Sequence, residues 1–212
     1  MRRITDVRLP QRPGHRDDTG LHWLSVDDQG HIAATGPMPS GRAMAGESWA
    51  GDRLSPRGID LQINGGLGLA FPELNECDVP KLEQLLELLW RDGVEAIAPT
   101  LVTCAVEPLR HALMVLRQVR DRHQPGRCRL LGAHLEGPFL AHARRGAHPA
   151  EHIAAPSLQA LEERIGGFET DIALITLAPE QTGSQQLVQR LGALGIITCL
   201  LYTSPSPRDN TT

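Results

Sequence analysis

The spacing of apolar residues along the chain changes at about residue 56. Before that point, short apolar runs alternate with polar residues at period two over residues 4–9, 21–26 and 31–34. An Asp/Gly turn, Asp27 to Gly30, separates the last two runs. This alternation around a tight turn is typical of β-hairpins. We therefore predict a small β-domain over residues 1–55.

After Gly58 the pattern becomes an alternation of strand-like and helix-like segments. The predicted strands are 58–65, 95–103, 129–136 and 171–177, and a fifth strand starts at 195–198. The predicted helices are 79–92, a segment from Glu107 onward, 157–165, and a segment that contains Leu187 and Leu194. Helix 79–92 has Pro80 in its first turn and Gly93 after its end, as helix termini favour. Repeated βα units predict an α/β fold with a parallel sheet.

Four βα units and the start of a fifth amount to about half of a (β/α)8 barrel, which typically needs about 250 residues. A doubly wound open sheet is the competing architecture, but the turn after the first strand lacks the G-x-G-x-x-G fingerprint of nucleotide-binding folds. We predict the first half of a (β/α)8 TIM-type barrel over residues 56–198, preceded by the small β-domain.

The last segment, residues 199–212, differs from the rest of the chain. It contains the only tyrosine, Tyr202, and a Pro-Ser-Pro sequence where a strand should continue. The string resembles one translated frame of a sequencing-library adapter. We expect it to be foreign to the natural protein, which would then be longer, and exclude it from fold prediction. A genuine polar C-terminal tail is the alternative.

Composition narrows the functional classes. The chain has 212 residues, of which 41% are hydrophobic and 22% charged, and its formal net charge is −4 without a Lys/Arg-rich run. These values are typical of a soluble globular protein, and they give no electrostatic signature for nucleic acid or an anionic membrane. No apolar run approaches the roughly 18 residues of a membrane span, and the N-terminus lacks the features of a secretory signal. We predict a cytoplasmic protein with no nucleic-acid or membrane partner.

The four cysteines are far apart and form no C-x-x-C pair. This spacing argues against a disulfide framework and against a cysteine zinc site. We expect four ordinary reduced thiols.

Candidate functional residues lie at the ends of predicted strands, where parallel barrels carry their active sites. Gln62 and Asn64, together with Asp60, fall on one face of the first barrel strand because side chains alternate. This period predicts a polar pocket mouth. The alternative is that the residues from Asn64 onward simply form the turn after the strand.

His134 and Glu136 share one face at the end of the third barrel strand. A carboxylate at an interior strand end is costly unless it meets a cation. Carboxylate and imidazole groups are normal ligands of zinc-like divalent ions, so a metal is one candidate partner. The alternative is an exposed glutamate in a loop.

The loop after this strand contains Arg144, Arg145, Gly146, Ala147 and His148. Two cations beside a flexible glycine and a histidine suit the recognition of a polar or anionic ligand. The alternative is a pair of solvated arginines beside an incidental histidine.

At these residues the sequence resembles the N-acetylglucosamine-6-phosphate deacetylases of the amidohydrolase superfamily. The most specific shared motifs are Q-I-N-G-G at residues 62–66 and H-L-E-G-P-F at residues 134–139. Further shared blocks, in the same order as in the family, are residues 93–103, 145–148 and 176–180. The resemblance covers about residues 1–198.

The resemblance implies roles for individual residues. Glu136 matches the metal-ligand glutamate of the family, and Ala147 and His148 match positions that contact the amino sugar. Gln62 and Asn64 stand where many amidohydrolases carry an H-x-H metal pair, which implies a site for a single divalent ion, expected to be zinc. Gln62, Asn64 and His134 are expected to line the pocket or support its ligands.

The resemblance also implies an activity for the full-length protein and the absence of that activity from this chain alone. The full-length protein is expected to hydrolyse the acetamide of N-acetylglucosamine 6-phosphate to glucosamine 6-phosphate and acetate, and assembly into homo-oligomers is left open. In the family, two histidine ligands and a catalytic aspartate belong to later strands, which this chain lacks after Thr198. We therefore expect no catalytic residue in this chain and no activity from it alone.

Two alternatives remain at this stage. One is an amidohydrolase that acts on a cyclic amide or ureide, although such relatives usually keep H-x-H at the first strand. The other is a non-catalytic half-barrel that serves as a binding module. Its open sheet edges and exposed apolar faces would favour association or aggregation.

Overall fold

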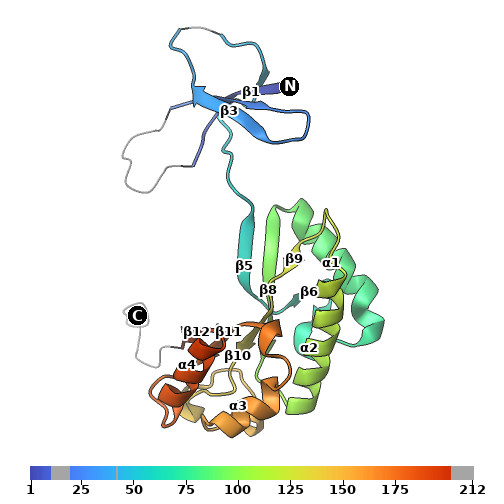
Figure 1. Ribbon diagram of the computed structural model, residues 1–212, viewed down its shortest axis with the longest axis vertical. Coiled ribbons are helices and arrows are strands. Elements are labelled where there is room, and N and C mark those ends of the chain that lie inside the picture. The colour runs from blue at the N-terminus through green and yellow to red at the C-terminus, as the bar shows by residue number, and fades with distance from the viewer. Residues whose placement is uncertain (11–19, 42, 202–212) are drawn as a thin grey trace. The chain divides into compact units, whose positions relative to one another are not determined.

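The computed structural model describes residues 1–10, 20–41 and 43–201 (Figure 1). The chain divides into two compact units, Met1–Arg57 and a second unit that begins at Gly58. The predicted tail, residues 199–212, lies outside the described residues from residue 202 onward.

The first unit is a four-stranded sheet in the order β3-β2-β1-β4. The strands are β1 (Arg2–Val7), β2 (His22–Val26), β3 (Ile32–Pro37) and β4 (Glu47–Ser48). Strand β2 pairs antiparallel with β1 and β3, as expected for a hairpin, whereas β4 pairs parallel with β1.

The turn between β2 and β3 is closed by one side chain. Asp27 Oδ1 accepts hydrogen bonds from the backbone N–H groups of Gln29 and His31, at 2.9 and 2.8 Å. Gly30 adopts a φ of +85°, which glycine adopts readily. The predicted Asp/Gly turn is therefore confirmed. The unit's buried apolar cluster is small and contains Ile4, Val7 and Leu24.

The second unit contains a curled parallel sheet with helices packed along it (Figure 1). Its order is β12-β11-β10-β8-β5, and the strands are β5 (Gly58–Ile63), β8 (Val94–Val102), β10 (Ala133–Glu136), β11 (Ile172–Leu177) and β12 (Ile197–Leu200). The helices are α1 (Val79–Arg91), α2 (Val106–Asp121), α3 (Leu158–Ile165) and α4 (Ser184–Ala193). A short hairpin, β6 (Gly65–Gly66) and β7 (Leu69–Ala70), follows β5.

The order of these strands decides between the two predicted architectures. The five strands β5, β8, β10, β11 and β12 pair in their order along the chain, without the reversal of order that defines a doubly wound sheet. Sequential parallel strands linked by helices are the arrangement of a (β/α)8 barrel. The predicted fold class, part of a TIM-type barrel, is confirmed.

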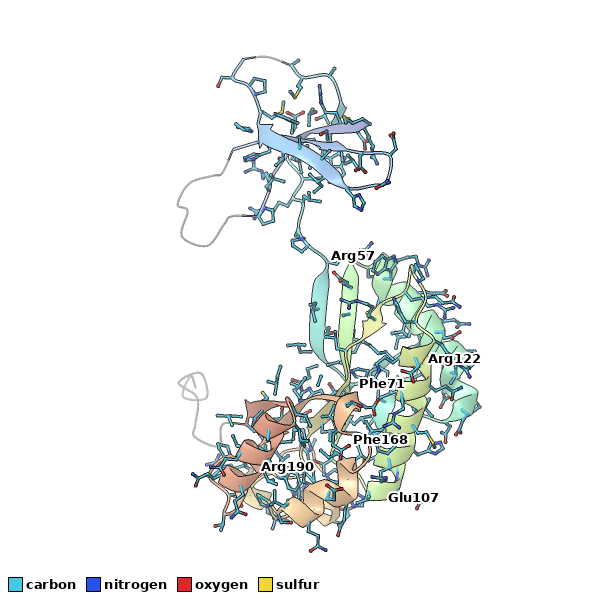
Figure 2. The ribbon with its side chains drawn as sticks, viewed as in Figure 1. Arg57, Phe71, Glu107, Arg122, Phe168 and Arg190 are labelled. Atoms are coloured by element: carbon cyan, nitrogen blue, oxygen red, sulfur yellow. The ribbon has the colours of Figure 1, made fainter. Side chains whose placement is uncertain are left out.

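Apolar side chains between the sheet and the helices form the main core. Helix α1 buries Leu82, Leu85 and Leu86, which recur at helical spacing. Phe71, in the short turn after β7, is completely buried and lies beside α2 (Figure 2). The Ser157 hydroxyl caps α3 by accepting the N–H of Ala160 at 3.1 Å.

Two strands depart from the predicted regular pattern. The predicted strand 129–136 is two pieces, β9 (Arg129–Leu130) and β10, because Gly132 between them adopts a φ of +125°. In β5, Asp60 and Ile63 pair with Ile97 and Pro99, so β5 holds one extra residue. Such a bulge interrupts the alternation of side chains, so alternation alone does not establish that Asp60, Gln62 and Asn64 share one face, and that grouping stays a prediction.

The two outer strands of the described sheet carry exposed apolar side chains. Ile59 on β5 is 56% exposed and Ile197 on β12 is 65% exposed. Leu61 and Leu200 on the same strands are also exposed. Among the described residues, no helix is long and apolar enough to cross a membrane.

A buried carboxylate joins α2 to the segment before β11. Asp171 is buried, and its Oδ2 accepts from Arg117 Nε at 2.9 Å and also from Arg117 Nη2. Arg120 Nη2 lies 2.6 Å from Asp171 Oδ1 and completes the cluster as an ion pair. The Arg117 guanidinium also stacks on Phe168, 4.4 Å from the ring centre, in the loop between α3 and β11 (Figure 2). These contacts fix the entry of the chain into β11.

Replacing Asp171 with asparagine should destabilise the second unit. The substitution leaves two guanidinium groups beside a neutral amide, and removal of one partner from a buried pair is costly. Because both arginines are partly exposed, we expect a loss of about 2 kcal/mol in the free energy of unfolding. Urea denaturation followed by far-UV circular dichroism measures it, since all the described α-helices belong to this unit. Asp121→Asn, at an exposed carboxylate 3.8 Å from Arg120 Nε, is the matched control and should change stability by less than about 0.5 kcal/mol.

The cysteines should differ in reactivity because they differ in burial. Burial raises the pKa of the Cys128 thiol to about 11 and also raises the pKa of Cys104, whereas Cys77 and Cys199 are exposed. At about pH 8, roughly one Cys128 thiol in a thousand is the reactive thiolate. Iodoacetamide should therefore label Cys77 and Cys199 first, as read by peptide mass spectrometry, and Cys128 only after unfolding. Equal labelling of Cys128 and Cys77 in the folded chain would contradict this burial.

Candidate functional site

The candidate site lies where the parallel strands end. Strand β10 pairs with β8 so that Glu136 is opposite Val102, and with β11 so that Glu136 is opposite Thr176. Thr103 follows the last residue of β8 directly. Because parallel strands end at the same edge of a sheet, these residues form one neighbourhood at the edge where barrels carry their active sites.

Glu136 is the centre of this neighbourhood, and its side chain is 16% exposed. Gln62 Nε2, from β5, donates a hydrogen bond to Glu136 Oε2 at 3.3 Å. His148 Nε2, from the loop after β10, lies 3.6 Å from Glu136 Oε1. The fold thus brings together three residues that the sequence identified as candidates, although they are separated by up to 86 positions in the chain.

Arg145 holds His148 in place. Its Nη1 donates to the His148 carbonyl at 2.8 Å, and the His148 N–H donates to the Arg145 carbonyl at 3.1 Å. Together these bonds close a tight turn that points the imidazole back to the strand ends. His148 Nδ1 then lies 2.9 Å from Thr103 Oγ1. The Arg145 guanidinium thus stabilises the loop that carries His148. Its role in the recognition of an anionic ligand stays a prediction.

His134 is buried below Glu136 and links three strands. Its Nδ1 lies 3.0 Å from the carbonyl of Leu61 on β5, and its Nε2 lies 2.7 Å from Thr176 Oγ1 on β11. A carbonyl can only accept, so Nδ1 carries the hydrogen and Nε2 accepts from the Thr176 hydroxyl. Burial lowers the pKa of His134, which favours this neutral form. Both ring nitrogens of His134 thus have hydrogen-bond partners on neighbouring strands. Its supporting role at the site stays a prediction.

Two further candidates lie apart from these contacts. Asn64 is exposed in the turn after β5, and its backbone carbonyl accepts from Phe71 N–H at 3.1 Å. Ala147 is exposed in the Arg145 turn. Within the described part of the chain, neither residue forms a hydrogen bond or ion pair with Glu136. Their roles in the pocket and in substrate binding stay predictions.

The site does not by itself contain enough ligands for a catalytic zinc ion. No group of three His, Cys, Asp or Glu side chains close enough to hold a metal occurs among residues 1–10, 20–41 and 43–201. Catalytic zinc sites normally use three protein ligands. Glu136 could supply one carboxylate, but the described residues do not complete the coordination.

Sequence reasoning missed the threonines that organise the site. Thr103 lies between Glu136 and His148, and Thr176 holds His134. The signal for Thr103 was its place immediately after an apolar strand, in a block shared with the deacetylases. The signal for Thr176 was a polar residue in the buried strand 171–177.

Comparisons with known proteins agree with the motifs. No protein-family model matches the chain. The chain is 36% identical over 150 residues to N-acetylglucosamine-6-phosphate deacetylase of Bos taurus, which covers 69% of this chain and 36% of the relative. It is 31% identical over 185 residues to N-acetylgalactosamine-6-phosphate deacetylase of Escherichia coli O157:H7, which covers 87% of this chain and 46% of the relative.

Solved structures give the same result for the fold. The crystal structure of N-acetylglucosamine-6-phosphate deacetylase from Pasteurella multocida superposes with a TM-score of 0.68 at 26% identity, covering 94% of this chain and 50% of that one. The Mycobacterium smegmatis deacetylase D267A mutant, in complex with N-acetyl-D-glucosamine-6-phosphate, has a TM-score of 0.69 at 22% identity and shares the fold. This chain therefore spans between about a third and a half of the length of these relatives.

Removing the Thr176 hydroxyl should destabilise the second unit. Thr176→Val keeps the shape of the side chain but leaves His134 Nε2 buried without its donor, at an expected cost of about 1 to 2 kcal/mol. Urea denaturation monitored by circular dichroism measures the loss. The matched control is Thr170→Val at an exposed position, expected to change stability by less than about 0.5 kcal/mol. If both variants unfold at the same urea concentration, the hydrogen bond to His134 does not stabilise this unit.

Proposed function

We infer that this chain belongs to the N-acetylglucosamine-6-phosphate deacetylases of the amidohydrolase superfamily, and we propose that the complete protein releases acetate from an N-acetylated amino sugar 6-phosphate. Curated relatives with that name confirm the resemblance that the motifs predict. The activity concerns the complete protein, because this chain matches only part of each relative.

The observation that supports this proposal most directly is the convergence on Glu136. A carboxylate at the mouth of a barrel is held by an amide donor, Gln62, and faces an imidazole, His148. This set places a candidate metal ligand beside a candidate substrate-binding group. The same residues belong to the motifs that the chain shares with the deacetylases.

We propose a role for each residue at this site. Glu136 provides one ligand of a divalent metal ion, for which we expect zinc, and the remaining ligands lie outside the described residues. His148 and Ala147 contact the amino sugar. Gln62 and Asn64 line the pocket, and His134 supports the strand that carries Glu136. The amidohydrolases that the chain resembles depend on a metal, whose chemistry is to polarise the scissile carbonyl and activate water.

The configuration of the substrate sugar at C4 distinguishes two candidate substrates. N-acetylgalactosamine 6-phosphate is a second candidate substrate, because the Escherichia coli relative that acts on it by name matches more of this chain than the Bos taurus relative does. The two sugars differ only in the configuration at C4. A pocket distinguishes them through hydrogen bonds to that hydroxyl.

The alternatives lose support from the same residues. A cyclic-amide or ureide hydrolase is expected to carry H-x-H at the first barrel strand, where this chain has Gln62, Ile63 and Asn64. A non-catalytic half-barrel would have to keep Ile59 and Ile197 in water at both outer strands. We therefore favour the deacetylase.

The proposal is tested on the complete protein and on the 212-residue chain in parallel. Sequencing the source DNA through the codons after Thr198 provides the complete reading frame. We expect acetate release from N-acetylglucosamine 6-phosphate or its galacto epimer by the complete protein, and its loss on metal chelation. We expect none from the 212-residue chain, because its described residues supply too few metal ligands. Faster hydrolysis of a cyclic amide than of either sugar phosphate would contradict the proposal.

A variant of the complete protein tests the role of Glu136. Glu136→Gln keeps the size of the side chain but removes the charge, and should lower kcat/KM by at least about a hundredfold through weakened metal binding. Metal content measured on the same samples should fall in parallel. Glu151→Gln, at an exposed carboxylate, is the control and should retain both metal and activity.

A further inference from the structure

Strand β5 contains its bulge in its last four residues. Three steps along β5, from Asp60 to Ile63, match two steps along β8. Leu61 and Gln62 lie between the paired residues and have no register partner of their own on β8. Bulges of this kind turn a side chain away from the regular alternation and are common beside active sites. The bulge thus releases Leu61 and Gln62 from the regular pattern of the strand.

Both bulged residues contact β10, although β8 lies between β5 and β10 in the sheet. The Leu61 carbonyl lies 3.0 Å from His134 Nδ1, and Gln62 Nε2 donates to Glu136 Oε2 at 3.3 Å. A carbonyl in a regular strand lies along the sheet and bonds to an adjacent strand. The Leu61 carbonyl reaches His134 because the bulge has turned its peptide group out of the sheet.

The carboxylate of Asp60 closes the bulge. Its Oδ1 accepts a hydrogen bond from the backbone N–H of Gln62 at 3.0 Å. A backbone donor without a ladder partner needs another acceptor, and a carboxylate is a strong one. This N–H belongs to the same planar peptide group as the Leu61 carbonyl. Asp60 and His134 therefore hold one peptide group at its two ends, and that peptide group sets the direction in which the Gln62 side chain leaves the strand.

The backbone of Glu136 is fixed by other contacts. The residue pairs with both neighbouring strands, and the Thr103 hydroxyl, which is 4% exposed, donates to its carbonyl at 3.0 Å. Gly137 adopts a φ of +84° and leaves room for that hydroxyl, because a Cβ at this position would collide with Thr103 Oγ1. The hydrogen bond from Gln62 acts on the Glu136 side chain instead and restrains the rotation of its carboxylate.

We propose that Asp60 is a positioning residue that holds the bulge of β5 and thereby directs the Gln62 amide to the Glu136 carboxylate. Carboxylates that bind metal ions are oriented by such hydrogen bonds, whose loss typically costs roughly 10- to 100-fold in metal affinity or activity. That Glu136 binds a metal ion rests on the proposed function, whereas the contacts of Asp60 and Gln62 do not. Asp60 acts through Gln62 and touches no reacting atom.

NMR on the 212-residue chain tests the proposal without a metal ion. We expect slow hydrogen exchange at the Gln62 N–H and side-chain amide signals distinct from those of a solvated glutamine, assigned by their loss in Gln62→Ala. Asp60→Ala removes the acceptor and should speed that exchange by about tenfold or more. The side-chain signals of Gln62 should then move to the solvated values. Asp60→Asn keeps an acceptor oxygen and should stay closer to the unsubstituted chain.

Unchanged exchange and unchanged Gln62 signals in Asp60→Ala would overturn the proposal. Circular dichroism establishes that each variant is folded. If the alanine variant is not, the unsubstituted chain and Asp60→Asn decide. A Gln62 N–H that exchanges as fast as in an unfolded peptide, in either of them, contradicts the proposal.

Asp27 provides a matched control in the first unit. Its Oδ1 accepts from the backbone N–H of Gln29 at 2.9 Å, at the same spacing of two residues. Asp27→Ala should speed exchange at Gln29 and leave the exchange and side-chain signals of Gln62 unchanged. A change at Gln62 in this variant would contradict a local role for Asp60.

A double-mutant cycle on the complete protein separates positioning from a direct role. Asp60→Ala should lower kcat/KM by about tenfold, as Gln62→Ala does, and the double variant should lose no more than Gln62→Ala alone. Losses that multiply in the double variant would contradict the proposal, as would a loss in Asp60→Asn as large as that in Asp60→Ala. Absence of deacetylation by the complete protein would remove the proposed function and leave the NMR result. Unchanged Gln62 signals in Asp60→Ala would remove the role of Asp60 and leave the deacetylase.

Discussion

The parallel register of β8, β10 and β11 places Glu136 beside the threonines that follow or belong to the neighbouring strands. Parallel strands end at one edge, so residues that follow different strands become neighbours without any local sequence relation. The buried imidazole of His134 reinforces that register, because it bonds β5 through the Leu61 carbonyl and β11 through Thr176. Glu136 lies two residues after His134, at the end of β10. Its position at the carboxyl-terminal edge of the sheet is thereby fixed. A shift of one residue in this strand would turn the carboxylate to the opposite face.

Much of the fold could be predicted because it is encoded in short-range patterns. Helical spacing of leucines, the Asp27 turn and the Ser157 cap each depend on residues a few positions apart. The breaks in the strands could not be predicted in this way. The bulge in β5 and the interruption at Gly132 become evident only when a strand is aligned with its neighbour, and that neighbour is distant in sequence.

The charged and imidazole side chains of the candidate site could be identified from the sequence, but the threonines that hydrogen-bond to them could not. Glu136 stands out as a carboxylate at a strand end and His148 as an imidazole beside two arginines in the following loop, and both belong to motifs shared with the deacetylases. Thr103 and Thr176 have common side chains, and their importance comes from atoms that only the folded chain brings within hydrogen-bond distance. Arg145 resembled an anion-binding residue in the sequence, yet its guanidinium forms a hydrogen bond to the backbone of the turn that carries His148. A motif therefore identifies the reactive group more readily than the scaffold that orients it.

The close approach of Thr103 to Gly137 has an evolutionary consequence. A larger residue at 137 would need both a different backbone conformation and the removal of the hydroxyl, whereas loss of the hydroxyl alone would leave the glycine without its steric reason. Gly137, which also adopts a φ of +84°, is therefore expected to persist while Thr103 is present, whereas position 103, 34 residues earlier, can change first. Divergent descendants that keep the glutamate but lose this pair would reveal that selection on the support of its backbone has been relaxed.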